Sequence, residues 1–75
     1  MPTFRIQPLE GSPRTVQALR LRSDDEHVYF EDRVQGSWQP VLELPLAEVE
    51  HVQRRLNETN GSWIWVTEPV RRMTL

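Results

Sequence analysis

Apolar and polar residues alternate along three short segments of the chain. In residues 3–7, Phe4 and Ile6 fall on one side of an extended backbone and their polar neighbours fall on the other. Residues 27–34 and 38–44 show the same period of two, which is typical of half-buried strands. The residues expected to face the core are Phe4, Ile6, Leu19, Leu21, Val28, Phe30, Val34, Trp38, Leu42 and Leu44.

Residues 14–22 predict a further extended segment with an irregularity in its middle. The apolar residues before Leu19 are out of phase with Leu19 and Leu21, and a bulge near Ala18 would bring the two halves onto one face. Proline, glycine and short polar residues mark the intervening loops and turns, which are 8–13, 23–26 and 35–37. We therefore expect three strands to form an antiparallel meander, over residues 14–22, 27–34 and 38–44.

After Pro45 the spacing of apolar residues changes from two to three or four. The residues at this spacing are Leu46, Val49, Val52 and Leu56. Such a pattern places them along one stripe of a helix. Pro45 suits a first helical turn because its missing N–H would have no partner there, and Asn60-Gly61 would end the helix with a left-handed cap. We expect one helix over about residues 46–58.

The segment 62–67 reads Ser-Trp-Ile-Trp-Val-Thr and predicts a final strand. Beyond it, we expect residues 68–75 to form a flexible tail. The expected fold class is α+β, a small antiparallel sheet of four or five strands with a single helix packed on one face. The pattern of Leu44–Val49 resembles that of small bacterial sheet-and-helix domains, a resemblance that carries no activity with it.

Length and composition restrict the class of protein further. A chain of 75 residues predicts one domain over residues 1–75. The absence of cysteine excludes a disulfide scaffold and fits a reducing compartment. With neither an apolar run of about 20 residues nor a signal peptide at the start, we expect a cytoplasmic protein without a membrane partner. The net charge of -2 gives no overall attraction to nucleic acid.

Few residues in the sequence suggest catalysis or metal binding. Asp24, Asp25 and Glu26 lack the alternate spacing and the glycine of a calcium loop. His27 and His51 lack the close pairing of a preformed metal site. We found no local motif that sets a nucleophile beside a base, and the chain is too short to enclose a deep cleft. We therefore expect a non-enzymatic protein without a catalytic residue, metal, cofactor or small-molecule substrate.

The sheet face opposite the expected helix is the most informative candidate site. Strand alternation gathers aromatic and guanidinium groups there, and the partner-binding residues it predicts are Trp63, Trp65, Tyr29, Arg5, Arg20, Arg22 and Arg33. Such residues favour protein interfaces, so we expect binding to another protein, most simply self-association as a homodimer. Two alternatives stay open. In the first, the arginines of this face pair across strands with Glu31 and Glu43 and their stems lie over the tryptophan rings, so that the face has a structural role only. In the second, the face binds single-stranded nucleic acid.

Overall fold

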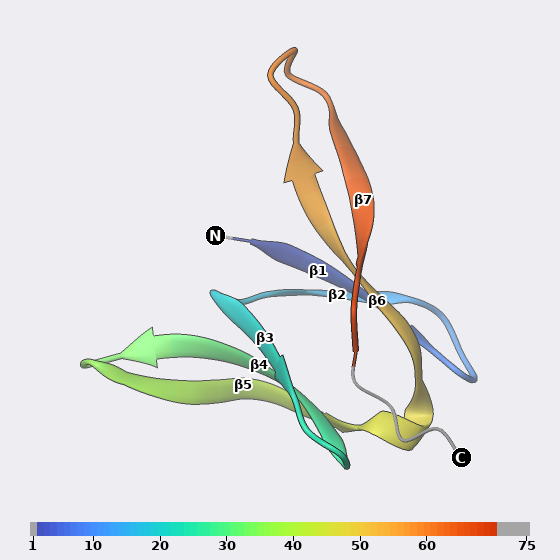
Figure 1. The fold of residues 1–75 in the computed structure, drawn as a ribbon, viewed down its shortest axis with the longest axis vertical. Helices are drawn as coiled ribbons and strands as arrows, with labels where there is room; N and C mark the ends of the chain where they lie inside the picture. Colours follow the sequence, from blue (N-terminus) through green and yellow to red (C-terminus); the bar gives the residue numbers. More distant parts are fainter. Residues whose placement is uncertain (1, 71–75) are drawn as a thin grey trace.

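In the computed structural model, which describes residues 2–70, the chain forms seven strands and one turn of 3-10 helix (Figure 1). Their bounds are β1 (Thr3–Pro8), β2 (Arg14–Gln17), β3 (Arg20–Ser23), β4 (His27–Val34), β5 (Ser37–Pro45), η1 (Leu46–Glu48), β6 (Val49–Asn57) and β7 (Trp63–Glu68). All neighbouring strands are antiparallel. They form a four-stranded sheet in the order β2-β1-β6-β7 and a three-stranded sheet in the order β3-β4-β5.

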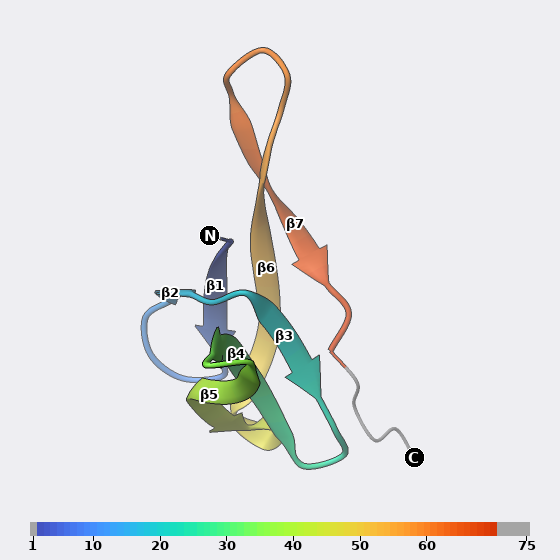
Figure 2. The ribbon, with the colours of Figure 1, turned by 90° about the vertical axis from the view of Figure 1, so that its left-hand side faces the viewer.

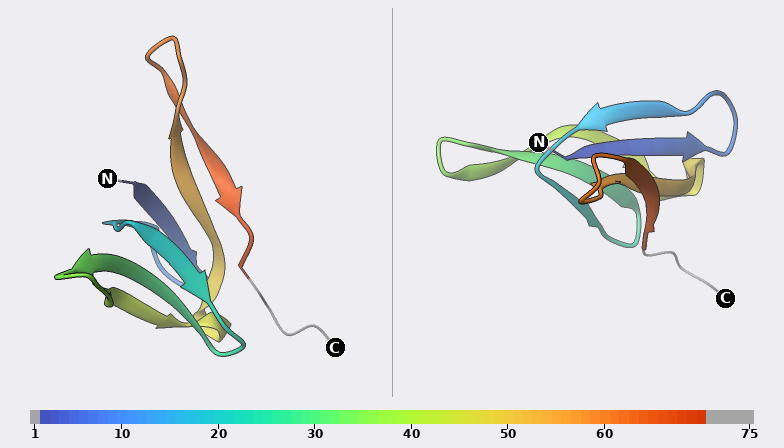
Figure 3. Two further views of the ribbon diagram at one scale, coloured as in Figure 1. Left: turned by 60° about the vertical axis from the view of Figure 1, so that its left-hand side comes forward. Right: turned by 90° about the horizontal axis from the view of Figure 1, so that it is seen from above.

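The chain passes from one sheet to the other at a sharp bend between β2 and β3. Ala18 N–H donates to the carbonyl of Pro2, next to β1, at 3.2 Å. Leu19 N–H donates instead to the carbonyl of Glu31 in β4, at 3.0 Å. The irregularity predicted near Ala18 is therefore a corner at which the strand switches sheets, and such corners are typical of two sheets that cross at a large angle (Figure 3).

The core lies between the two sheets. Its buried apolar side chains come from both layers and are Phe4, Ile6, Ala18, Val28, Phe30, Leu46, Val49 and Val52. The rings of Phe4 in β1 and Phe30 in β4 lie 5.4 Å apart and are tilted by 58°. A tilted aromatic pair at this separation is favourable, so this contact joins the two sheets at the centre of the core.

The predicted helix over residues 46–58 is wrong, and with it the α+β sheet-and-helix architecture. Only Leu46–Glu48 is helical, as a 3-10 turn, and Val49–Asn57 is strand β6. The ladder with β1 is irregular here: Val49 lies opposite Pro8 and His51 opposite Gln7, so Glu50 is the additional residue of a β-bulge. Because the bulge adds one residue, two side chains three positions apart, Val49 and Val52, both face the core and imitate a helical spacing.

The segment expected to cap the helix instead forms the turn between β6 and β7. Gly61 has φ +88°, a conformation that glycine adopts readily. Glu58 N–H donates to the carbonyl of Ser62 at 2.8 Å and closes the hairpin. Asn-Gly between two alternating segments is also a common hairpin signal. The final strand predicted over about 62–67 is confirmed as β7, although the structure places it beside β6 in an all-β arrangement.

A second bulge reverses the expected orientation of Trp38. In the β4–β5 ladder, Phe30 lies opposite Leu42 but Glu31 lies opposite Pro40, so Val41 is the additional residue. Leu42 and Leu44 pack against the core as expected. Beyond the bulge the alternation changes phase, so Trp38 lies on the outer face instead of the core face.

The end of the chain is partly described. Glu68, predicted to begin the flexible tail, is the last residue of β7, and Val70 packs against the core. The rest of the predicted tail, residues 71–75, lies outside the described residues. Within residues 2–70, no helix has the length and apolar character needed to cross a membrane.

Two aspartate substitutions distinguish strand β6 from the predicted helix. Val52 is fully buried, whereas Leu56 is 44% exposed although both would share the buried stripe of a helix. Val52→Asp would bury an unpaired charge and should reduce the free energy of unfolding by roughly 3–5 kcal/mol, enough to unfold a small domain. Leu56→Asp should cost less than about 1 kcal/mol. Thermal melts followed by circular dichroism measure both effects, and an equal loss for the two variants would contradict the register of β6.

Candidate functional site

The seven predicted partner-binding residues do not form one surface. Three of them, Arg5, Trp63 and Trp65, lie on the outer face of the four-stranded sheet, which we call the hairpin face. The other four lie on the outer face of the three-stranded sheet, which we call the meander face, and they are Arg20, Arg22, Tyr29 and Arg33. Because the two sheets pack through their inner faces, these outer faces point away from each other.

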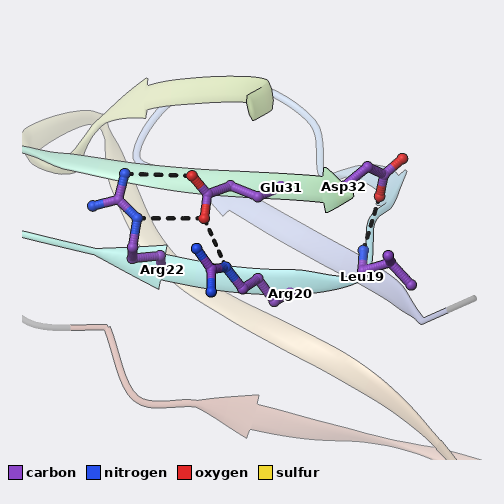
Figure 4. A network of polar contacts seen from close by, with 5 residues as sticks. All are labelled: Leu19, Arg20, Arg22, Glu31 and Asp32. Carbon is purple, nitrogen blue, oxygen red and sulfur yellow. Dashed lines mark hydrogen bonds and ion pairs between the residues drawn. The ribbon is translucent and has the colours of Figure 1, made fainter. Parts of the chain in front are cut away.

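Glu31 is the centre of the meander face. It occupies the middle strand, β4, opposite Arg20 of β3, and it is only 4% exposed. Its Oε1 accepts hydrogen bonds from Nε of Arg20 at 2.8 Å and from Nε of Arg22 at 3.3 Å (Figure 4). The carboxylate therefore lies between two guanidinium groups that cover it from solvent.

Aromatic rings flank the same two arginines. The Cζ atom of Arg20 lies 3.7 Å from the ring centroid of Trp38, and that of Arg22 lies 4.1 Å from the centroid of Tyr29. Trp38 was missed as a member of this surface because its segment reads as regularly alternating. The proline at position 40 was the available signal, since proline in a strand often marks a bulge or an edge.

These contacts change the proton affinity of the groups involved. Burial raises the pKa of Glu31, but the hydrogen bonds from Arg20 and Arg22 outweigh this effect and leave the pKa below its ordinary value. The hydrogen bond to Glu31 also raises the pKa of Arg22. Arg20 and Arg22 are thus engaged with an internal carboxylate, which lowers their capacity to bind an external anion.

The turn between β3 and β4 is organised by Asp24. Its Oδ1 accepts hydrogen bonds from the backbone N–H groups of Glu26 and His27, each at 2.8 Å, and its Oδ2 accepts one from the Tyr29 hydroxyl at 2.8 Å. The two backbone hydrogen bonds, followed by the one from Tyr29, lower the pKa of Asp24 to about 2. Asp24 is therefore a structural residue of the turn, as its type and position suggest.

The hairpin face carries a second set of stacked cations. The Cζ atom of Arg5 lies 4.5 Å from the ring centroid of Trp65, and that of Arg55 lies 4.5 Å from the centroid of Trp63. The two indoles meet edge to face, with centroids 5.6 Å apart. Arg55 was missed because the helix prediction placed it away from this face. Strand alternation in β6 and β7 brings these groups from three strands onto one surface.

The outer half of the β6–β7 hairpin extends beyond the second sheet (Figures 1 and 2). Leu56 and Ile64 lie opposite each other on its inner face and are 44% and 45% exposed. Trp63 lies on the outer face and is 44% exposed. Large apolar side chains are thus exposed on both faces of one hairpin, whereas Val49 and Val52 in the other half of β6 are buried.

The residues considered for metal binding are dispersed. His27 lies in β4 and His51 in β6, which belong to different sheets. Among residues 2–70, no three histidine, aspartate or glutamate side chains gather as metal ligands.

No family model, curated protein or solved structure matches the chain significantly. The candidate site is therefore described only by the contacts, distances and burial of its residues in this structure.

Removing the charge of Glu31 tests the role of the arginine pair. Glu31→Gln leaves two guanidinium groups without their common carboxylate and should reduce the free energy of unfolding by about 1–3 kcal/mol, a range that allows for the partial exposure of both arginines. The matched control is Glu10→Gln in the exposed β1–β2 loop, with an expected change below about 0.5 kcal/mol. Urea unfolding of both variants provides the comparison. Equal stability of the two would contradict the network.

Acid titration tests Asp24. Folding lowers its pKa from 3.8 to about 2, so its ionised form stabilises the native state fully above pH 3.8, and this stabilisation disappears as the pH falls towards 2. Asp24→Ala should therefore be less stable than the parent protein at pH 6, and the difference should shrink below pH 3.8. Glu26→Ala, two positions along the same turn, is the control and should show a smaller change at pH 6. A difference for Asp24→Ala that did not depend on pH would argue against an ionised cap.

Proposed function

We propose that this protein is a non-enzymatic protein-interaction module that self-associates through its β6–β7 hairpin. One observation carries the proposal: Leu56, Trp63 and Ile64 are each about half exposed, on two faces of a hairpin whose outer half has no second layer among the described residues. Exposed apolar patches on small domains often mark interfaces. The cytoplasm, which the absence of cysteine suits, is the location we assign to it.

The energetics of a small domain favour covering this hairpin. An isolated two-stranded hairpin is only marginally stable in water, and β6–β7 extends past the core that supports its first half. A domain of this size also buries a small fraction of its surface compared with larger proteins. A partner that covers the hairpin would remove the apolar surface of Trp63 and Ile64 from water and would hold the two strands together.

Of the two outer faces, the hairpin face is the better candidate for contact with a partner. On the meander face, Glu31 forms an ion pair with both Arg20 and Arg22, and their guanidinium groups already stack on aromatic rings. On the hairpin face, the described contacts of Arg5 and Arg55 with the indoles are cation–π contacts and leave the tryptophans partly exposed. Tryptophan and arginine are the residues most enriched at interface hot spots.

Single-stranded nucleic acid is the less favoured ligand. Stacking platforms for bases combine aromatic rings with a positively charged groove. Here the hairpin-face tryptophans lie on a different sheet from the three arginines of the meander face, where Trp38 stacks on Arg20 but Glu31 and Glu43 add negative charge. The net charge of -2 further reduces any attraction to phosphate.

A double tryptophan variant tests the proposal. The intact protein should elute as a dimer by size exclusion with light scattering, and its stability should rise by about 1.4 kcal/mol of dimer for each tenfold increase in concentration. Trp63→Ser combined with Trp65→Ser should give a monomer whose lower stability is independent of concentration. The matched control is Trp38→Ser on the meander face, which should keep the dimer.

Two results would contradict this proposal. The intact protein could be a monomer at every concentration, in which case the exposed hairpin has another explanation. Alternatively, a fluorescence titration with short oligonucleotides at two salt concentrations could show salt-sensitive binding that the double tryptophan variant abolishes. That second result would support nucleic-acid binding in place of self-association.

A further inference from the structure

Strand β7 is an edge strand whose outer backbone groups point away from the sheet. The Glu58 N–H donates to the carbonyl of Ser62, which makes these two residues a hydrogen-bonded pair of the hairpin. Hydrogen-bonded and non-hydrogen-bonded pairs alternate along an antiparallel ladder. Ile64, Val66 and Glu68 therefore bond to β6, while the N–H and C=O groups of Trp63, Trp65 and Thr67 face outward.

Among residues 2–70, the two sheets have four edge strands, and β7 is the one that no described feature protects. The edges β2 and β3 have only four residues each. The edge β5 is longer, but Pro40 removes a donor and the bulge at Val41 interrupts its ladder. Over Trp63–Thr67, β7 contains neither proline nor charge, and its register with β6 is unbroken. Natural proteins normally blunt such edges or cover them with another strand.

We propose that β7 of a second copy of this chain covers this edge as an antiparallel strand, with the two-fold axis at Trp65. This inference rests on the proposed self-association and specifies its geometry. The two four-stranded sheets would then form one continuous sheet. A two-fold interface brings the same patch of each copy together, so it needs a self-complementary segment. An antiparallel segment without charge meets this need because no like charges are placed opposite each other.

The outward backbone groups restrict the register. Only registers that place outward residues opposite one another form hydrogen bonds, so Trp65 must face Trp65, or a neighbouring outward residue, of the other copy. Centring on Trp65 places Trp63 opposite Thr67 of the second copy and uses all three outward residues, giving about six inter-chain hydrogen bonds. It also leaves Glu68, which is paired with Arg54 at 2.6 Å, at the margin of the contact.

A proline substitution removes the edge donor without touching the intrachain ladder. Thr67→Pro eliminates an N–H that faces outward, and proline is tolerated on edge strands for this reason. The variant should fold with the same far-ultraviolet spectrum and elute with half the apparent mass of the parent. Thr67→Ser, which keeps the backbone N–H, is the matched control and should remain a dimer.

A distance measurement tests the register even if Thr67→Pro fails to fold. The chain has no cysteine, so Ser62→Cys gives a single site for a spin label. Pairing centred on Trp65 places the two labelled positions about 20 Å apart, six residues along paired strands. A dimer with this distance between its labels, which Thr67→Pro converts to a monomer, supports the inference.

The outcomes separate failure of the edge pairing from failure of self-association. A dimer that persists in folded Thr67→Pro, or whose labels are much farther apart than about 20 Å, would overturn the edge pairing and leave self-association intact. An intact protein that stays monomeric at all concentrations would overturn both proposals.

Discussion

The contact between the rings of Phe4 and Phe30 joins two sheets whose shared core contains few buried apolar side chains. Packing between layers requires apolar side chains from both, and these gather around the two rings. Strand β6 enters this region with Val49 and Val52 and then leaves it. The limited reach of the second sheet thus divides one long hairpin into a half that contributes Val49 and Val52 to the core and a half that extends beyond the second sheet (Figures 1 and 2). The proposed function follows from this division.

The two outer faces use similar residues for different purposes. On the meander face, Glu31 fixes Arg20 and Arg22 at short distances, and burial of the carboxylate makes this arrangement costly to break (Figure 4). On the hairpin face, Arg5 and Arg55 stack on indoles at the border of an unprotected edge strand. The same combination of arginine and aromatic residues therefore surrounds a buried carboxylate on one sheet and lies beside partly exposed indoles on the other.

Much of the local structure could be predicted from the sequence, but its assembly could not. Alternation identified the strands around Phe4 and Phe30 because both segments are half-buried along most of their length. The bulge at Glu50 gave Val49 and Val52 a helical spacing, and propensity gives no sign of a bulge. The candidate residues were predicted to share one face, but the corner between β2 and β3 places them on two different sheets. A corner depends on tertiary packing and does not follow from strand periodicity.

Amide hydrogen exchange along β7 tests the central claim most directly, because it reports on each backbone N–H separately. If a second copy pairs with the edge, the outward amides of Trp63, Trp65 and Thr67 are protected in concentrated protein and lose this protection on dilution, while Ile64 and Val66 stay protected at both concentrations. Rapid exchange of the three outward amides at every concentration, beside protected Ile64 and Val66, would show that the edge is open to water and would contradict the account.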